Sequence, residues 1–222
     1  MSKAFDRLDH KILVQKLSSF GLSDSLIQII SSYLTNRPQY VQCRGHKSNF
    51  FHQKSDVPQG SVLGPLLFNI YVNDFQTVID TEFLLYADDI KLLRQINSIE
   101  DCKHLQENLN KVHKWCLCNT LSLNFIKCKV MSYSRTKNTL NFDYLIGSDT
   151  INRPEFVQDL GVTFDKHLNF NEQVNTVTNK ACKTLGFFMK STRDFSKFET
   201  TRHLFKALVR SKLEYASIIW NP

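Results

Sequence analysis

The sequence lacks any long uncharged apolar run. No such stretch reaches about 18 residues, the length that a membrane-crossing helix needs, so no membrane span is expected. Charged residues at positions 3, 6, 7 and 9 interrupt the apolar residues at the start, and no signal-peptide pattern is found there. Internal repeats, low-complexity tracts and a long linker are also missing. These absences predict a folded protein that is not secreted and has no membrane partner.

Acidic residues are in the minority, with 21 Asp and Glu against 28 Lys and Arg. The formal net charge of +7 favours partners with a phosphate backbone, because bound phosphates release counterions. A generic basic domain is the alternative that charge alone leaves open. With 222 residues, 42% of them hydrophobic, the chain has enough apolar material for one or two packed units.

The cysteines do not form a paired Cys-x-x-Cys arrangement. Zinc is an alternative for one cluster, because Cys and His are its usual ligands: Cys102, His104, His113, Cys116, Cys118 and Cys128. Much of this cluster falls on one predicted helix, which does not suit a zinc site. Buried free thiols in a reducing compartment are the favoured interpretation.

Apolar periodicity and end signals predict the secondary structure. Asp9 and Ser23 are candidate N-caps, and Gly21 is a helix-end signal between them. Helices are predicted over residues 8–20, 23–34, 66–78, 99–117, 170–190 and 198–219. Strands are predicted at 83–85 and 90–93, at 129–134 and 141–145 around a loop at 135–138, and in a hairpin of 40–44 and 49–55 around Gly45. This pattern predicts an α+β fold, with a small antiparallel sheet backed by helices.

Two adjacent carboxylates stand between two apolar runs. Tyr86, Ala87, Asp88 and Asp89 follow the first run and precede the second, which predicts a strand, a tight turn and a strand with the acids at the turn. Neighbouring anions repel each other, and hard oxygen ligands suit Mg²⁺, which takes one or two carboxylates plus substrate phosphates. A solvated Asp-Asp turn is the alternative.

A second motif precedes the acidic pair. Pro58 has a fixed φ, Gly60 permits unusual dihedral angles, and the Gln59 amide can both donate and accept hydrogen bonds. This chemistry suits contact with a nucleotide or a template base. The alternative is an ordinary loop that caps the apolar helix after it.

Together these segments resemble the palm of a reverse transcriptase from a non-LTR retrotransposon of the jockey type. The matches occur in the family's order: residues 2–10 resemble motif A, 58–68 motif B, 86–89 motif C and 159–165 motif E. Motif D is matched by Trp115, Asn119, Leu121, residues 123–124 and residues 127–128. Residues 204–211 and 220–222 resemble the thumb region. The resemblance implies a polymerase palm over residues 1–168 and a helical thumb-like region over residues 169–222.

The resemblance also implies an activity and its partners. It implies an RNA-directed DNA polymerase, a nucleotidyltransferase that adds deoxynucleotides to a primer 3′-hydroxyl with Mg²⁺ ions, or with Mn²⁺ in their place. The implied partners are an RNA template, a DNA primer and deoxynucleoside triphosphates. Upstream fingers and an endonuclease domain of the same polyprotein are further implied partners, in the nucleus or the cytoplasm.

Residue roles follow from the same resemblance. Asp88 and Asp89 would bind the metal ions, and Lys127 would protonate the leaving pyrophosphate. Phe5 would be the steric gate that selects deoxynucleotides. The remaining substrate contacts would come from Pro58, Gln59, Gly60, Tyr86 and Ala87. A core phenylalanine and an exposed lysine are the alternatives for Phe5 and Lys127.

The sequence departs from the family at motif A. The family's first metal-binding aspartate would fall immediately before Met1, and Asp6 lies on the wrong side of the motif to replace it. The fingers, which precede motif A in the family, are missing as well. We therefore expect an internal piece of a longer polyprotein with negligible activity alone. A non-catalytic nucleic-acid-binding remnant of a mobile element is the alternative.

Overall fold

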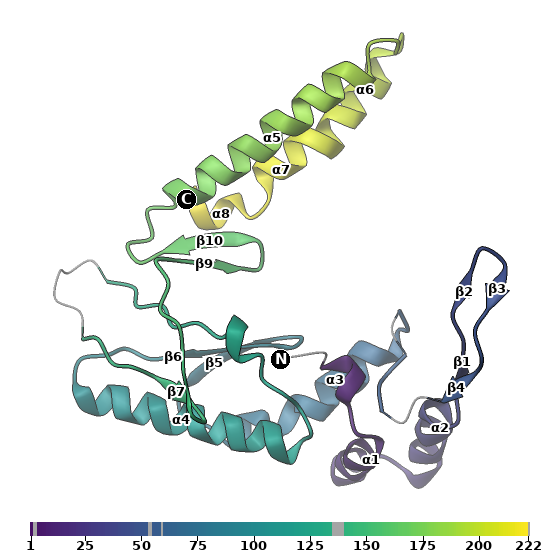
Figure 1. Cartoon of the computed structure of the whole chain (residues 1–222), viewed down its shortest axis with the longest axis vertical. Helices are drawn as coiled ribbons and strands as arrows, with labels where there is room; N and C mark the ends of the chain where they lie inside the picture. Colours follow the sequence, from purple (N-terminus) through teal and green to yellow (C-terminus); the bar gives the residue numbers. More distant parts are fainter. Residues whose placement is uncertain (2–3, 53–54, 59, 135–139, 222) are drawn as a thin grey trace. The chain divides into compact units, whose positions relative to one another are not determined.

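The computed structural model describes residues 1, 4–52, 55–58, 60–134 and 140–221 (Figure 1). Gln59 and the loop predicted at 135–138 lie outside these ranges. Helices and short antiparallel strand pairs alternate along the described chain, a mixture compatible with the α+β class. The strands pair two by two, where one small sheet was predicted. None of the helices in these ranges is both long and apolar enough to cross a membrane.

The chain divides into two compact units. The first comprises Met1–Cys128 and Leu140–Ile151, and the second comprises Lys129–Thr139 and Asn152–Pro222. The motif E hairpin belongs to the second unit. The palm and thumb boundary near residue 168 stays a prediction.

The first unit begins with η1 (Phe5–Arg7), α1 (His10–Ser19) and α2 (Asp24–Leu34). Asp9 caps α1 as predicted, because its carboxylate accepts hydrogen bonds from the backbone nitrogens of Lys11 and Ile12 at 2.8 and 3.1 Å. Gly21 follows α1 with a φ of +78°, the left-handed geometry that ends many helices. Ser23 stands at the N-cap position of α2, but its side chain makes no capping hydrogen bond.

A hairpin follows α2. Strand β1 (Pro38–Gln39) pairs with β4 (Phe51–His52), and β2 (Gln42–Cys43) pairs with β3 (His46–Lys47), both antiparallel. Arg44 and Gly45 form the turn with φ values of +48° and +85°, the pair of positive angles that tight hairpins use. The structure confirms the hairpin predicted around Gly45, with shorter paired segments.

Three helices share the core of the first unit. Helix α3 (Leu63–Val72) and the 3₁₀ turn η2 (Asn73–Thr77) cover the helix predicted at 66–78, and α4 (Ile99–Cys118) matches the helix predicted at 99–117. With α1 they bury one apolar cluster that includes Leu13, Leu17, Leu67, Phe68, Tyr71, Val112 and Trp115. Burying each such leucine or phenylalanine side chain contributes about 1.5–3 kcal/mol.

The acidic pair lies on a hairpin of β5 (Glu82–Tyr86) and β6 (Asp89–Leu93), as predicted. Alternate residues Phe83, Leu85, Ile90 and Leu92 pack against the core, because side chains on a strand alternate between its two faces. The first unit also contains η3 (Phe125–Lys127), β7 (Leu145–Ile146) and β8 (Asp149–Thr150).

Two predicted strands do not form. Among the described residues of 129–134, only Lys129 makes a β-bridge, an isolated one to Asn152, and in 141–145 only Leu145 belongs to a strand. The backbone nitrogen of Val130 donates to the Asn152 oxygen at 2.9 Å. A strand needs a neighbouring backbone along its length, so local composition alone did not suffice.

The second unit holds a hairpin and a helical hairpin. Strands β9 (Phe156–Asp159) and β10 (Val162–Asp165) pair antiparallel, and α5 (Asn171–Ser191) confirms the helix predicted at 170–190. The helix predicted at 198–219 is instead α6 (Phe198–Phe205), the π-helical turn η4 (Lys206–Arg210), α7 (Ser211–Glu214) and α8 (Ser217–Trp220). Ala216 breaks it with a φ of +52°. In Figure 1, α7 runs back beside α5.

Candidate active site at the β5–β6 turn

Two carboxylates lie at the tip of the β5–β6 hairpin. Tyr86 pairs with Asp89, so Ala87 and Asp88 form a two-residue turn. Ala87 has a φ of +51°, a left-handed conformation that costs an alanine about 1 kcal/mol. The buried face of the hairpin offsets this strain. The turn presents Asp88 half-buried, whereas Asp89 and Tyr86 are exposed.

The first residue of the chain lies at the same turn. The N-terminal ammonium of Met1 donates a hydrogen bond to the carbonyl oxygen of Asp88 at 2.7 Å, and its nitrogen is 3.8 Å from Asp88 Oδ2. The Met1 side chain packs against the core cluster, which holds the ammonium there. The residue just before the motif A segment therefore contacts the motif C turn in the folded chain.

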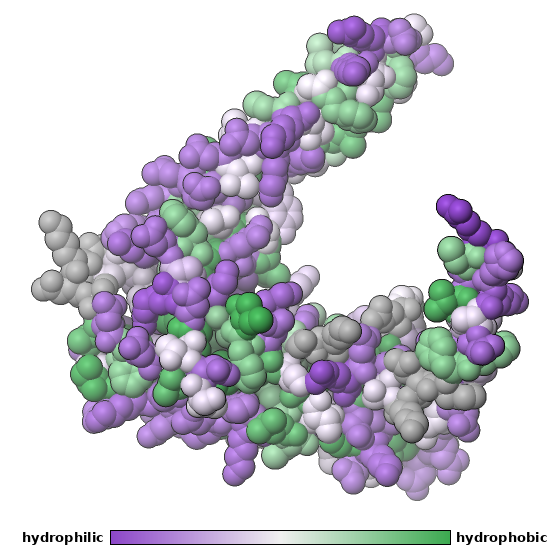
Figure 2. All heavy atoms as spheres, viewed as in Figure 1, coloured by the Kyte–Doolittle hydropathy of each residue, from purple (hydrophilic) through white to green (hydrophobic). Residues whose placement is uncertain are grey.

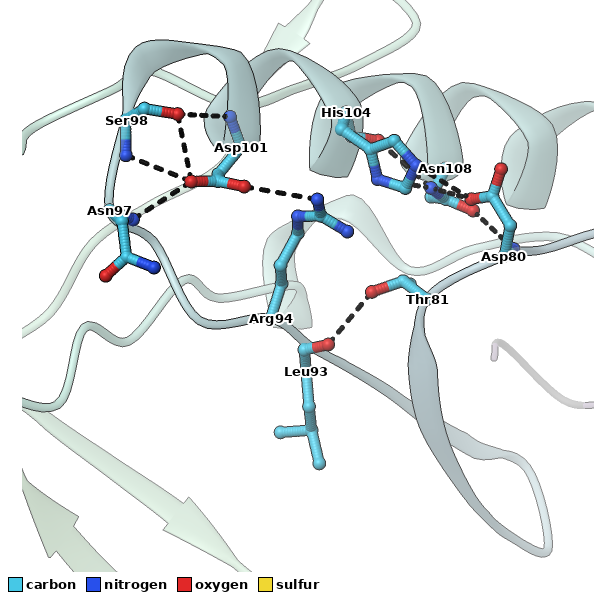
Figure 3. Close-up of polar contacts among 9 residues, drawn as sticks. All are labelled: Asp80, Thr81, Leu93, Arg94, Asn97, Ser98, Asp101, His104 and Asn108. Atoms are coloured by element: carbon cyan, nitrogen blue, oxygen red, sulfur yellow. Dashed lines mark hydrogen bonds and ion pairs between the residues drawn. The ribbon is translucent and has the colours of Figure 1, made fainter.

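One strand of the hairpin is tied to α4 through Asp80, just before β5 (Figure 3). The fully buried Asn108 accepts a hydrogen bond from the Asp80 backbone nitrogen at 3.0 Å and donates to Asp80 Oδ1 at 2.5 Å. Lys111 Nζ lies 3.1 Å from Asp80 Oδ2, and His104 Nε2 lies 3.3 Å from Oδ1. The hydrogen bonds from Asn108 and Lys111 lower the pKa of Asp80.

The other strand is tied to the first turn of α4. Arg94, just after β6, donates to Asp101 Oδ1 at 3.1 Å, as Figure 3 shows. Asp101 Oδ2 also accepts hydrogen bonds from the backbone nitrogens of Asn97 and Ser98, both at 3.0 Å, and from the Ser98 hydroxyl. These bonds stabilise the carboxylate and lower the pKa of Asp101 to about 2.

A further hydrogen bond joins the two strands at the base of the hairpin, where Thr81 Oγ1 donates to the backbone oxygen of Leu93 at 2.9 Å. Helix α4 therefore fixes both strands below the acidic turn. Two pairs of residues make these ties, Asp80 with Asn108 and Arg94 with Asp101. We call these two contacts together the hairpin clamp.

The motif B loop caps α3. Ser61 Oγ donates to the Pro58 oxygen at 2.7 Å and accepts from the Gly64 nitrogen at 2.9 Å. A Cβ on Gly64 would lie 3.1 Å from the Pro58 oxygen, so this close approach favours glycine. Gly60 is exposed with a φ of +79°. The geometry shows the capping role of this loop, and its nucleotide contacts stay a prediction.

Phe5 is joined to the motif B segment. Its ring stacks on that of the fully buried Phe68 with centroids 4.4 Å apart, and its backbone oxygen accepts from the Val57 nitrogen at 3.2 Å. The Phe5 side chain is half-buried, so one part of the ring contacts the core and another part is accessible.

Lys127 lies on η3 with an exposed side chain. Within the described residues its side chain makes no ion pair or hydrogen bond, so the structure does not join it to the acidic turn. Its backbone nitrogen donates to the backbone oxygen of Asn124 at 3.0 Å and to Asn124 Oδ1 at 3.3 Å. Its role stays a prediction.

The cysteines are free thiols, of which Cys102 and Cys116 are buried. In the part of the chain that the structure describes, no three His, Cys, Asp or Glu side chains gather as a metal site.

Sequence reasoning missed the hairpin clamp and the contact of Met1. Ser98 and Asp101 form the S-x-x-D pattern of a capping box, which was readable in the sequence. Asn108 stands four residues before Val112 on the buried face of α4. A polar residue at such a position was the only signal of a buried hydrogen-bond network.

Comparisons with known proteins match the whole chain. A profile of the family described as reverse transcriptase (RNA-dependent DNA polymerase) matches residues 1–189. The chain is 29% identical to the RNA-directed DNA polymerase from mobile element jockey of Drosophila funebris, covering 100% of the chain and 25% of that protein.

Two further relatives come from Drosophila melanogaster. The probable RNA-directed DNA polymerase from transposon BS is 30% identical, over 81% of the chain and 21% of that protein. The probable RNA-directed DNA polymerase from transposon X-element is 24% identical, over 99% of the chain and 25% of that protein. The chain thus spans about a quarter or less of the length of the relatives it matches.

Proposed function

We propose that this chain, which belongs to the reverse transcriptase (RNA-dependent DNA polymerase) family, carries the metal-binding turn of an RNA-directed DNA polymerase of a non-LTR retrotransposon. One observation carries the proposal: the Asp88–Asp89 turn contacts Met1, the residue just before the motif A segment, with the Met1 nitrogen 2.7 Å from the Asp88 oxygen. The family places its first metal-binding aspartate one position before Met1. In a longer protein, a residue attached to that nitrogen would stand beside Asp88.

The residues present fit a divalent cation. Mg²⁺ takes one or two protein carboxylates and completes its shell with phosphates and water. Asp88 and Asp89 supply two carboxylates, and Asp88 already faces a cation, the Met1 ammonium at 3.8 Å. Asp88 and Asp89 would hold Mg²⁺, or Mn²⁺ in its place, and the ion would lower the pKa of a primer 3′-hydroxyl and neutralise charge on the leaving pyrophosphate.

The chain's other residues bind and orient the substrate. The Phe68 ring stacks on that of Phe5 and supports it. In this proposal Phe5 is the steric gate that rejects a ribose 2′-hydroxyl. Tyr86 and Ala87 flank the deoxynucleoside triphosphate at the turn, and Lys127 supplies a proton to pyrophosphate. Backbone and amide groups of Pro58, Gln59 and Gly60 contact the nucleotide opposite an RNA template.

Metal binding to residues 1–222 tests the site directly. We expect Mn²⁺, titrated by its electron paramagnetic resonance signal, to bind at least about tenfold more weakly to Asp88→Asn and Asp89→Asn, because each variant removes a charged ligand. Asp149→Asn is the matched control, since Asp149 is an exposed carboxylate of another hairpin in the same unit. Equal Mn²⁺ affinity in all three variants would contradict the proposal.

Catalysis is tested in an extended chain to which fingers and an aspartate have been added before Met1. Asp88→Asn should lower kcat for primer extension on an RNA template by at least about 100-fold, while Asp149→Asn leaves it unchanged. Residues 1–222 alone should show negligible extension, because the family's first metal-binding aspartate is not among them. Full extension by the Asp88→Asn protein would show that the turn is not the metal site.

A further inference from the structure

An exposed hairpin extends from the end of α2, and we call its residues 38–52 the arm. Every described side chain from Tyr40 to Phe51 is exposed. Four of them are large and apolar, with exposed fractions of 40% for Tyr40, 62% for Val41, 67% for Phe50 and 45% for Phe51. Figure 2 shows apolar and polar residues interleaved on the arm. Apolar side chains that gather on a surface in this way mark a binding site.

Two rings of the arm form a pair with a cation beside it. The centroids of Tyr40 and Phe50 lie 5.4 Å apart with the rings at 82°, and Lys47 Nζ lies 4.8 Å from the Tyr40 centroid. The backbone next to the rings is held by Val41 and Ser48, whose main-chain groups bond at 2.9 Å. The edge-to-face geometry leaves Phe50 largely free for a planar ligand to stack on it.

The charge of the arm has one sign. No acidic residue occurs between Asp24 and Asp56 in the sequence, whereas Arg44 and Lys47 are exposed close to the turn. A surface with exposed rings and cations but no carboxylates complements a ligand that carries both flat bases and phosphates. Exposed rings stack only on bases that are unpaired, which favours a single strand over a duplex.

The base of the arm is anchored in the first unit. Arg37 forms an ion pair with the buried Asp56 and donates through Nε to the Leu34 oxygen at 3.4 Å. The backbone oxygen of Asp56 is 2.8 Å from His10 Nε2. The arm is thus a preorganised platform, which lowers the ordering cost of binding.

We propose that the arm binds single-stranded nucleic acid, with Tyr40 and Phe50 stacking on bases and Arg44 and Lys47 contacting phosphates. Identifying this strand as the single-stranded part of the template rests on the proposed function. The binding itself follows from the rings and charges of the arm alone.

Fluorescence anisotropy of residues 1–222 with a labelled single-stranded RNA of about 12 nucleotides tests the proposal. Tyr40→Ala and Phe50→Ala should each weaken binding by at least about fivefold. The matched control is Phe20→Ala, whose ring is 46% exposed but lies outside the arm. Thermal unfolding followed by circular dichroism should give the same Tm for the Phe50→Ala variant and the unmodified chain, since the side chain is exposed.

A second comparison separates stacking from charge. An abasic strand keeps the phosphates but offers no base to either ring, so the unmodified chain should bind it at least as weakly as Phe50→Ala binds the ordinary strand. Replacing Arg44 and Lys47 with Gln should flatten the slope of log affinity against log salt by about 1.4, because each phosphate contact on a single strand contributes about 0.7. Unchanged affinity in the ring variants, or equal binding of both strands, would overturn the proposal and leave the arm as a surface for a protein partner.

The failures of the two proposals are distinguishable. Asp88→Asn should leave anisotropy binding of the single strand unchanged, because Asp88 lies outside the arm. If Asp88→Asn did not weaken Mn²⁺ binding while Tyr40→Ala and Phe50→Ala still weakened RNA binding, only the polymerase assignment would be rejected. If Asp88→Asn weakened Mn²⁺ binding but Tyr40→Ala and Phe50→Ala left RNA binding unchanged, only the proposal that the arm binds a single strand would be rejected.

Discussion

Cys116 and Cys118 lie two residues apart on α4 in different surroundings. Burial raises the pKa of the Cys116 thiol to about 12, whereas Cys118 is exposed. The thiolate is the form that reacts with alkylating agents, and at pH 8 a pKa near 12 leaves a thiolate fraction of about one in 10⁴. We expect iodoacetamide to modify Cys118 and leave Cys116 unmodified until the chain is unfolded. Peptide mapping by mass spectrometry checks this, and equal modification of the two thiols would contradict the burial.

Single residues also show how far the sequence predicts the site. The turn position of Asp88 and Asp89 was predictable, because two apolar runs flank the pair and hairpin chemistry is local. The contact between Met1 and Asp88 was not, since it joins residues 87 positions apart. The stacking of Phe5 on Phe68 is likewise a tertiary contact. Residue type predicted which groups could act at the site, and tertiary packing decided which of them meet.

Helix α4 holds the acidic hairpin through Asn108. This side chain is fully buried, and its amide bonds the Asp80 backbone, the Asp80 carboxylate and the His104 oxygen. Asn108→Ala should lower the free energy of unfolding by about 2–4 kcal/mol, because the variant removes three hydrogen bonds of a buried amide, each contributing about 0.5–1.5 kcal/mol. Urea unfolding measures the change. The matched control is Asn110→Ala, an exposed asparagine of the same helix, which should change stability by less than about 0.5 kcal/mol.

Hydrogen exchange links that loss to the hairpin. The amides of Tyr86 and Asp89, which pair across the turn, should exchange faster in Asn108→Ala than in Asn110→Ala. Equal exchange in both variants would show that the clamp does not position the turn.

Elements differ in how much of their structure local sequence determines. Helices α4 and α5 match their predicted bounds within one or two residues, because a long apolar period and local hydrogen bonds determine a helix. The strands predicted at 129–134 and 141–145 failed, because pairing depends on a distant backbone. The C-terminal helix breaks at Ala216, where no glycine or proline marks the left-handed residue.

Across the whole molecule, both units contain carboxylates whose charged form is stabilised by folding. In the first unit, the hydrogen bond from Asn108 lowers the pKa of Asp80, and the bonds from the Asn97 backbone nitrogen and the Ser98 hydroxyl lower that of Asp101. In the second unit, desolvation of Asp165 is outweighed by bonds from the backbone nitrogens of Phe170, Asn169 and His167, so its pKa is lowered too. The pKa of Asp56 is instead raised, because burial disfavours its charged form despite the nearby Arg37.

These shifts predict how stability depends on acid. A carboxyl group with a pKa lowered by folding contributes stability above its ordinary pKa of about 3.8, and this contribution is lost as the pH falls through its folded value, about 2 for Asp101. We expect the urea midpoint to be nearly constant from pH 7 to pH 5 and to fall below about pH 4. Asp101→Asn should lower the midpoint at pH 7 and flatten the acid slope, since the amide does not titrate. An unchanged acid slope in this variant would mean that other carboxylates dominate, and that the cap of α4 contributes nothing to acid sensitivity.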